Sequence, residues 1–144
     1  MSAKTDTSLD RRSRQEPETL RLRSVSPALT ASDLEASIAW YRDVVGFTVA
    51  QTWEDEGRMK GADLVAGSCR LIVTQDDWAK GRDRVKGLGF RLHMATAQDI
   101  DEVAGAIKSR GGTLDREPDD QPWGGRAFSL SDPDGFSLTI ASEG

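Results

Sequence analysis

The chain has 144 residues, of which 37% are hydrophobic and 30% are charged, and its formal net charge is −5. This composition is typical of a globular domain, and the length suits one compact domain or two small halves that share a core. Negative charge spread along the chain argues against a nucleic-acid partner. The single cysteine, Cys69, excludes an intrachain disulfide and fits the reducing cytoplasm, where we expect the protein to be located.

The chain lacks the sequence features of a membrane or secreted protein. No apolar run approaches the ~20 residues that a membrane helix needs, so we expect no membrane association. The first residues lack the apolar segment of a secretory signal. Residues 1–19 are instead rich in Ser, Thr, Arg, Asp and Glu, which predicts a polar tail. We expect the folded domain to cover residues 20–142.

The first module, about residues 20–76, is organised around a predicted helix over 33–45. Ser32 and Glu35 match the S-x-x-E capping box that starts many helices, and Gly46 stands where a left-handed cap would end this one. Apolar residues recur on one face of the helix, at Leu34, Ile38, Tyr41 and Val45. Alternating and β-branched residues predict strands on both sides of it, over 20–30, 47–53, 59–66 and 69–75.

A polar connector, residues 77–87, leads to a second module over residues 88–142, and we expect its basic side chains to be solvated. The second helix is predicted over 98–110, with an apolar stripe at Ile100, Val103, Ala104 and Ile107. Strands are predicted over 90–95, 113–117, 126–131 and 136–141. Between the last two stands Asp-Pro-Asp-Gly, a strong turn signal because Pro fixes φ and Gly permits positive φ.

The second module repeats the first at a distance of 66 residues. Asp33 corresponds to Asp99 and Gly46 to Gly112, so the chain contains a duplicated unit. One such unit leaves a sheet face and a sheet edge uncovered and is not expected to be stable alone. The predicted fold is therefore α+β, with two tandem βαβββ modules forming a curved eight-stranded mixed sheet. Its concave face would enclose a small-molecule ligand.

Three segments of the chain resemble the vicinal oxygen chelate superfamily, which includes glyoxalase I and the bleomycin resistance proteins. They are S-D-L-E-A-S-I-A-W-Y-R-D-V-V-G-F at 32–47, Q-D-I-D-E-V-A-G-A-I-K-S-R-G-G at 98–112 and D-P-D-G-F-S-L-T-I at 132–140. The resemblance implies the glyoxalase/bleomycin resistance fold over residues 20–142 and a homodimer that shares its ligand clefts between subunits. Because this fold hosts several chemistries, the resemblance alone does not fix an activity.

The resemblance also implies four positions at which metal-dependent relatives hold their ion. Here these positions are occupied by Ser26, Val73, Leu92 and Thr139. None of these side chains is charged, whereas a divalent ion needs three or four His, carboxylate or thiolate ligands. We therefore predict that the protein holds no metal and no cofactor, as in the bleomycin-binding branch of the family.

His93 is the one residue that complicates this prediction. It lies one residue beyond the position of Leu92, so in an unbroken strand we expect its side chain to face away from the cleft. It is then a hydrogen-bonded structural residue. A bulge would turn it into the cleft, where it would bind ligand, act as a base or ligate a metal. The catalytic residue is therefore unknown, with His93 as the candidate.

Aromatic and polar side chains at strand ends and in loops are the candidates for ligand contacts. The predicted ligand-binding residues are Trp53, Gln75, Trp78, Arg91, Trp123 and Arg126. The alternative for each tryptophan is that it covers a core edge or a subunit contact. A guanidinium at the cleft mouth would bind a carboxylate or phosphate, and the alternative for Arg126 is a surface ion pair with Asp119 or Asp120.

Three functions are compatible with these patterns. The first is a metal-free small-molecule binding protein that sequesters its ligand, as in antibiotic resistance, and a cleft lined by Trp and Arg would favour it. The alternative is a glyoxalase-like lyase or isomerase with His93 as general base, which an inward-facing histidine backed by a carboxylate would favour. The third is an interaction role, for which the cleft would be filled by side chains. The sequence leaves open whether the protein is an enzyme.

Overall fold

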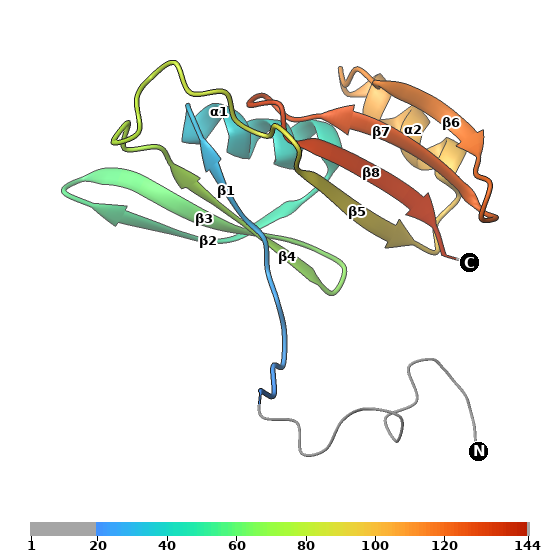
Figure 1. Ribbon diagram of the computed structural model, residues 1–144, viewed down its shortest axis with the longest axis horizontal. Helices are drawn as coiled ribbons and strands as arrows, with labels where there is room; N and C mark the ends of the chain where they lie inside the picture. The colour runs from blue at the N-terminus through green and yellow to red at the C-terminus, as the bar shows by residue number, and fades with distance from the viewer. Residues whose placement is uncertain (1–19, 144) are drawn as a thin grey trace.

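The computed structural model describes residues 20–143, which form two βαβββ modules (Figure 1). The first consists of β1 (Ala28–Ala31), α1 (Leu34–Ala39), the π-helical segment η2 (Trp40–Val45), β2 (Thr48–Asp55), β3 (Arg58–Ala66) and β4 (Cys69–Gln75). The second consists of β5 (Arg91–Thr96), α2 (Ile100–Ser109), β6 (Arg116–Asp120), β7 (Arg126–Ser131) and β8 (Ser137–Ser142). The predicted tail, residues 1–19, lies outside the described residues.

The eight strands form two four-stranded mixed sheets, which we call sheet A and sheet B. Sheet A has the strand order β1-β4-β3-β2, and sheet B has the equivalent order β5-β8-β7-β6. In each sheet the first two strands of this order are parallel and the other neighbours are antiparallel. This confirms the predicted fold class, with the eight strands divided between two sheets. The helices pack on one face of each sheet (Figure 1), and we call the opposite face the open face.

Both helices begin at an aspartate cap, at equivalent positions of the two modules. The carboxylate of Asp33 accepts a hydrogen bond from the backbone N–H three residues later at 3.2 Å, and that of Asp99 does so at 3.0 Å. The predicted cap at Ser32 is wrong, because the Ser32 side chain is bound to Asp134 of the other module. Gly46 has φ of 113° and ends η2, as predicted.

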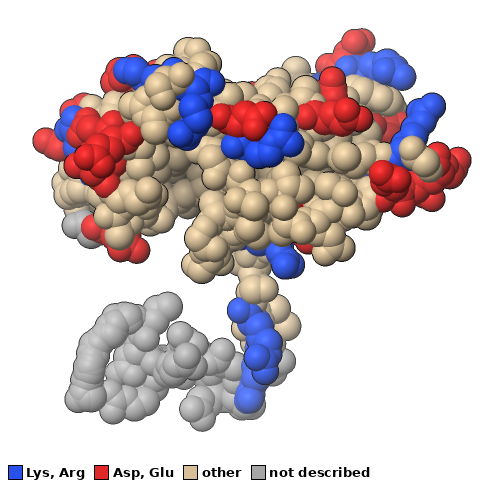
Figure 2. All heavy atoms as spheres, turned by 180° about the vertical axis from the view of Figure 1, so that it is seen from behind, with Lys and Arg blue, Asp and Glu red and all other residues tan. Residues whose placement is uncertain are grey.

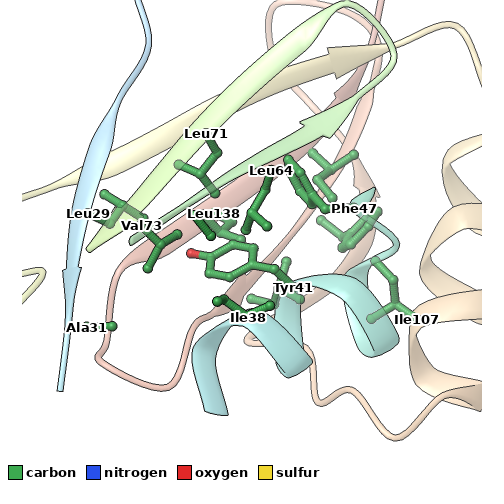
Figure 3. Close-up of a cluster of buried hydrophobic side chains, with 14 of the residues drawn as sticks. Leu29, Ala31, Ile38, Tyr41, Phe47, Leu64, Leu71, Val73, Ile107 and Leu138 are labelled. Atoms are coloured by element: carbon green, nitrogen blue, oxygen red, sulfur yellow. The ribbon is translucent and has the colours of Figure 1, made fainter. Parts of the chain in front are cut away.

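One hydrophobic core joins the two modules (Figure 3). Tyr41 and Ile107 are both fully buried on the helix faces that the sequence predicted. Other core residues come from both sheets, among them Leu29, Leu64, Leu71, Val73, Phe128, Leu130 and Leu138. Because burial of this apolar surface drives folding, the shared core fixes the two modules against each other. No helix among the described residues has the length and apolar character required to cross a membrane.

Two predicted strands have different bounds in the structure. The first was predicted over 20–30, but β1 begins at Ala28 because the preceding residues leave the body without a neighbouring strand (Figure 1). Their apolar side chains are exposed, namely Leu20, Leu22 and Val25. The strand predicted over 113–117 is displaced to β6, because residues after the helix first turn back and pairing with β7 starts only at Arg116.

Candidate functional site

A hollow of about 1080 Å³ lies over the open face of sheet B, and we call it the sheet B hollow. Its walls come from strands of sheet B and from loop 121–125, which joins β6 to β7. Among its lining residues are Arg91, His93, Arg116, Glu117, Asp119, Asp120, Trp123, Ser129, Ser137 and Thr139. All of them belong to the second module, so this module alone forms the floor and the surrounding wall.

Four of these residues form one row across the sheet, one from each strand. His93 is paired in register with Thr139, Thr139 with Ser129, and Ser129 with Arg116. Residues that face each other across neighbouring strands share one side of a sheet. The row therefore places an imidazole and a guanidinium at the two edges, with two hydroxyls between them. At ~4.8 Å per strand, the Cα atoms of His93 and Arg116 are about 14 Å apart.

The next row of the open face is made of small side chains. Ala95 is paired with Ala141, and Ala141 with Ala127. Ala127 and Ala141 are 5% and 3% exposed, whereas Ala95 is exposed, so the methyl groups of this row are accessible mainly at the β5 edge. Trp123 lies in loop 121–125 at this end of the hollow, and 69% of its surface is exposed. The exposed indole itself provides a surface on which an aromatic ring can stack.

His93 faces the sheet B hollow, so the expectation that it faces away from the cleft is wrong. The reason is a connection that differs in length between the modules. β5 ends three residues before its helix cap, Asp99, whereas β1 ends two residues before Asp33. Since side chains alternate between the two faces of a strand, this one residue puts His93 on the open face and turns Leu92 toward the core.

The last strands of the two modules differ in the same way. The predicted equivalence of Val73 and Thr139 does not hold, because Val73 is 1% exposed in the core whereas Thr139 lines the hollow. β8 follows a five-residue connection, 132–136, while β4 follows the two-residue turn Gly67–Ser68. The repeat of 66 residues therefore holds at the helix caps and fails at this strand.

The side chains of the open face do not fit a metal ion. At the positions that metal-dependent relatives use, sheet B offers the hydroxyl of Thr139 with the imidazole of His93 beside it. One histidine and neutral hydroxyls fall short of the three or four His, carboxylate or thiolate ligands that such an ion requires. Within residues 20–143, no group of three or more His, Cys, Asp and Glu is placed to hold an ion.

The two predicted arginines have different surroundings. Arg91 lines the sheet B hollow, whereas Arg126 lies beside it and is bound by two carboxylates. Arg126 donates from Nε to Asp101 at 2.9 Å and from Nη1 to Asp120 at 3.1 Å. The hydrogen bond from Arg126 lowers the pKa of Asp101. Arg126 thus has the surface pairing that was its alternative role, with Asp101 on α2 as a partner that sequence spacing did not indicate.

Gln75 and Trp78 line a second hollow, of about 610 Å³, between α1, the β2–β3 hairpin and the connector. We call it the connector hollow. Gln75 accepts a hydrogen bond from the backbone N–H of Leu34 at 3.0 Å and donates to three nearby carbonyls. Its amide is therefore occupied in holding the start of α1. The Trp78 ring lies 4.7 Å from the Arg82 guanidinium and 5.1 Å from the Lys86 ammonium.

Trp53 lies on the open face of sheet A. It is paired with Gly61 of β3, and its ring covers that glycine: a Cβ at position 61 would lie 2.1 Å from the ring. Gly61 thus leaves room for the indole to lie across the sheet. The three predicted tryptophans are in three places: Trp53 on sheet A, Trp78 in the connector hollow and Trp123 in the sheet B hollow.

A polar network that the sequence did not predict links the modules. The ammonium of Lys86 lies 3.0 Å from Asp76 and 3.0 Å from the hydroxyl of Ser32, which is bound to Asp134. The side chains of Lys86 and Asp76 are each 3% exposed, so the connector is not solvated throughout as expected. The hydrogen bond from Lys86 lowers the pKa of Asp76. Lys86 stands in a run of alternating charges, a pattern that carries no sign of burial.

A second buried contact joins η2 to the turn before β8. The Tyr41 hydroxyl donates to Asp132 at 2.8 Å, and Asp132 also accepts from the backbone N–H groups of Asp134 and Phe136. Burial raises the pKa of both Tyr41 and Asp132. Asp132 thereby holds its own turn in shape and fixes it to the other module.

A duplicated βαβββ chain with an open sheet face in each module defines a class of fold, and comparison with known proteins identifies the family. Residues 23–140 match the model of the Glyoxalase/Bleomycin resistance protein/Dioxygenase superfamily. The chain belongs to this superfamily, as its sequence resemblance implied. No curated protein matches the chain significantly.

Solved structures share the fold along nearly their whole length. TioX from Micromonospora sp. ML1 has a TM-score of 0.68 at 20% identity, covering 81% of this chain and 95% of that one. A member of the same superfamily from Sphaerobacter thermophilus has a TM-score of 0.68 at 26% identity, covering 86% and 100%. Lactoylglutathione lyase from Agrobacterium tumefaciens has a TM-score of 0.62 at 20% identity, covering 85% and 95%. At these identities the likeness establishes the fold, and function depends on the site.

Proposed function

We propose that the protein is a metal-free small-molecule binding protein that sequesters its ligand on the open face of sheet B. The observation that carries the proposal is the combination of the polar row from His93 to Arg116 with the exposed Trp123 at the end of the hollow. Ligand sites typically join an apolar surface to a few convergent polar groups. The sheet B hollow has both, and it is not filled by side chains.

A second copy of the chain is the proposed source of the opposite wall. The sheet B hollow is lined by one module alone, so it has a floor without a complete cover. Large apolar side chains outside it are also left exposed, among them Val25 at 88%, Val85 at 74% and Leu88 at 86%. Exposed apolar side chains in such number support association. The proposed state is therefore a cytoplasmic homodimer, and an exposed free thiol at Cys69 fits that reducing location.

The alternative function is a glyoxalase-like lyase or isomerase in which His93 is the general base. The observation that favours it is the position of His93 in the sheet B hollow, where it could reach a proton of a bound ligand. A catalytic histidine is usually held in one orientation by a partner group. Within the described residues no carboxylate is bonded to the His93 imidazole. Binding is therefore the first proposal and catalysis the second.

A thermal-shift screen of glycopeptide, aromatic and phosphonate compounds tests the binding proposal. A ligand should raise the melting temperature of the wild-type chain, and Trp123→Ala should abolish the rise. Trp78→Ala is the matched control, because Trp78 lies in the connector hollow, and it should retain the rise. A shift that survives Trp123→Ala while Trp78→Ala removes it would place the ligand in the connector hollow and contradict the proposal.

The metal-free state is tested separately. Elemental analysis of protein purified without chelator should show zinc, nickel, manganese and iron far below one equivalent per chain. A near-stoichiometric ion that is lost in His93→Gln would contradict the proposal. The catalytic alternative is tested with the ligands from the screen: turnover in the wild type that disappears in His93→Gln, with ligand affinity preserved, would favour the enzyme over the sequestering protein.

A further inference from the structure

Acidic and basic side chains are intermixed over the side of the molecule shown in Figure 2, so local pairing decides which charge a ligand meets. Three acids line the sheet B hollow. Glu117 is bound to Lys108 at 2.9 Å, and Asp120 is bound to Arg126 at 3.1 Å. Asp119 accepts a hydrogen bond from the backbone N–H of Asp120. Two of the three carboxylates are thus neutralised by cations of the chain itself.

The two arginines of the hollow are in the opposite situation. Arg91 and Arg116 both line it, and among the described residues neither has an ion-pair partner. Arg91 is two residues before His93 on the same strand face and is paired in register with Ser137. Arg116 is on β6, at the other edge of the sheet. Two unpaired guanidiniums therefore flank a floor of hydroxyl groups, which can also donate hydrogen bonds.

The chemistry of this arrangement selects an anion. A guanidinium binds a carboxylate through two parallel hydrogen bonds, which are stronger than bonds between neutral groups. A cationic ligand would meet two unpaired guanidiniums, with Asp119 as the one lining carboxylate that has no cation of its own. The hydroxyls of Ser137 and Thr139 would satisfy the remaining lone pairs of an acid group.

The dimensions of the open face indicate the rest of the ligand. From the row of Arg91 to the row of Ala95 the strand advances four residues, or about 13 Å. The path ends at Ala95, and Trp123, on which a flat ring can stack, lies across the sheet from β5, in the loop before β7. The path is long enough for a fused pair of aromatic rings that carries an acid group at one end.

We infer that the ligand class is a flat aromatic acid, with its ring at Trp123 and its carboxylate bound by Arg91 over the hydroxyl floor. Arg116 adds attraction from the opposite edge. This inference rests on the proposed function, because it names the kind of molecule that the proposed site takes. It identifies Arg91 and Arg116 as the residues that set the preference for charge.

Three probes of one shape and different charge test the inference on the full chain: 2-naphthoate, naphthalene-2-carboxamide and 2-naphthylmethylamine. Isothermal titration calorimetry at low salt should show 2-naphthoate binding at least ~10-fold more tightly than the amide, because it gains charge-assisted hydrogen bonds. The amine should bind most weakly. Added salt should weaken binding of the acid and leave the amide unchanged.

Arginine variants then locate the preference. Arg91→Gln should reduce the affinity for 2-naphthoate to that for the amide, and Arg116→Gln should reduce it by a smaller factor. Arg58→Gln is the matched control, since Arg58 is exposed and lines the connector hollow. Each of the three variants replaces an exposed arginine that forms no ion pair within the described residues. The melting temperatures of all three should therefore equal that of the wild type.

The outcomes separate the inference from the proposed function. If acid and amide bind equally and Trp123→Ala abolishes both, the ligand class is wrong and the site stands. If the amine binds most tightly, or if none of the probes binds, the inference is overturned. If instead a ligand found in the thermal-shift screen binds Trp123→Ala as well as the wild type, the proposed site itself fails.

Discussion

The two modules have the same helices, caps and strand order, but their open faces carry different chemistry. The central row of sheet A consists of Thr30, Thr74, Gly61 and Trp53, whereas that of sheet B consists of His93, Thr139, Ser129 and Arg116. The comparison teaches that duplication preserved the parts that pack against the core. The connections differ by one residue before the helices and by three before the last strands, and an odd difference reverses which side chains along a strand reach the open face.

The largest effect is expected where the two cores differ in volume. Ala62 of β3 is buried opposite Val73, whereas the larger Phe128 of β7 is buried opposite Ile140. Phe128→Ala should therefore lower the free energy of unfolding by ~3–5 kcal/mol, because it leaves a cavity. Urea denaturation measures this. A loss below ~1 kcal/mol would show that the second module is loosely packed at this point, contrary to the structure.

Equivalent helix positions also differ, since Tyr41 corresponds to Ile107 of α2 and both are fully buried. Tyr41→Phe should lower the free energy of unfolding by ~1–3 kcal/mol, because the buried carboxylate of Asp132 loses its donor. The control Ile107→Val removes one methylene without a hydrogen bond and should cost ~0.5–1.5 kcal/mol. Urea denaturation again gives both values. Equal stability of Tyr41→Phe and the wild type would show that the Tyr41–Asp132 hydrogen bond does not stabilise the fold.

Two buried aspartates should give opposite pH dependence. The pKa of Asp76 is lowered from its ordinary 3.8 by Lys86, so its stabilising contribution is present above pH 3.8 and is lost as pH falls through the folded-state pKa. The pKa of Asp132 is raised from 3.8 by burial. Its contribution therefore becomes less favourable as pH rises from 3.8 through the folded-state pKa.

The measurement is urea denaturation of Asp76→Asn and Asp132→Asn from about pH 3 to about pH 7, where the carboxyl groups titrate. The deficit of Asp76→Asn relative to wild type should be largest at neutral pH and shrink in acid. For Asp132→Asn, the free energy of unfolding relative to that of the wild type should be most favourable at neutral pH. Parallel pH curves for both variants would contradict the assigned shifts.

The smallest effect is expected at the rim of sheet B. Arg126 is 37% exposed and its partner Asp101 is 57% exposed, and ion pairs in such positions add little stability because water screens them. Arg126→Ala should shift the melting temperature by less than about 2 °C and leave ligand affinity unchanged, since Arg126 does not line the sheet B hollow. A strong loss of affinity in Arg126→Ala would contradict this prediction and show that the binding site includes Arg126.

Sequence patterns predicted the frame of the molecule because its signals are local. The stripe around Tyr41, the helix end at Gly46 and the turn at Asp132 each depend on residues within one or two turns of chain. The open face could not be predicted in the same way. Whether His93 faces the ligand or the core depends on a single residue in the β5–α2 connection, and a repeat counted from helix to helix does not detect it.

The buried pairs were missed for a different reason. Lys86 and Asp76 are polar residues in a polar connector, and only the packing of one module against the other removes them from water. Their burial is a long-range property, whereas composition is local. The need for glycine at position 61 is also a long-range property, because it follows from the Trp53 ring that lies across it.

The central claim is that ligand binds on the open face of sheet B, and an NMR titration tests it most directly. Amide resonances of the ¹⁵N-labelled chain should be followed as 2-naphthoate is added. The account predicts that the shifted resonances belong to β5, β7, β8 and loop 121–125, with His93, Ser129 and Thr139 among them. Shifts confined to the connector hollow, around Arg58, Gln75 and Trp78, would contradict it.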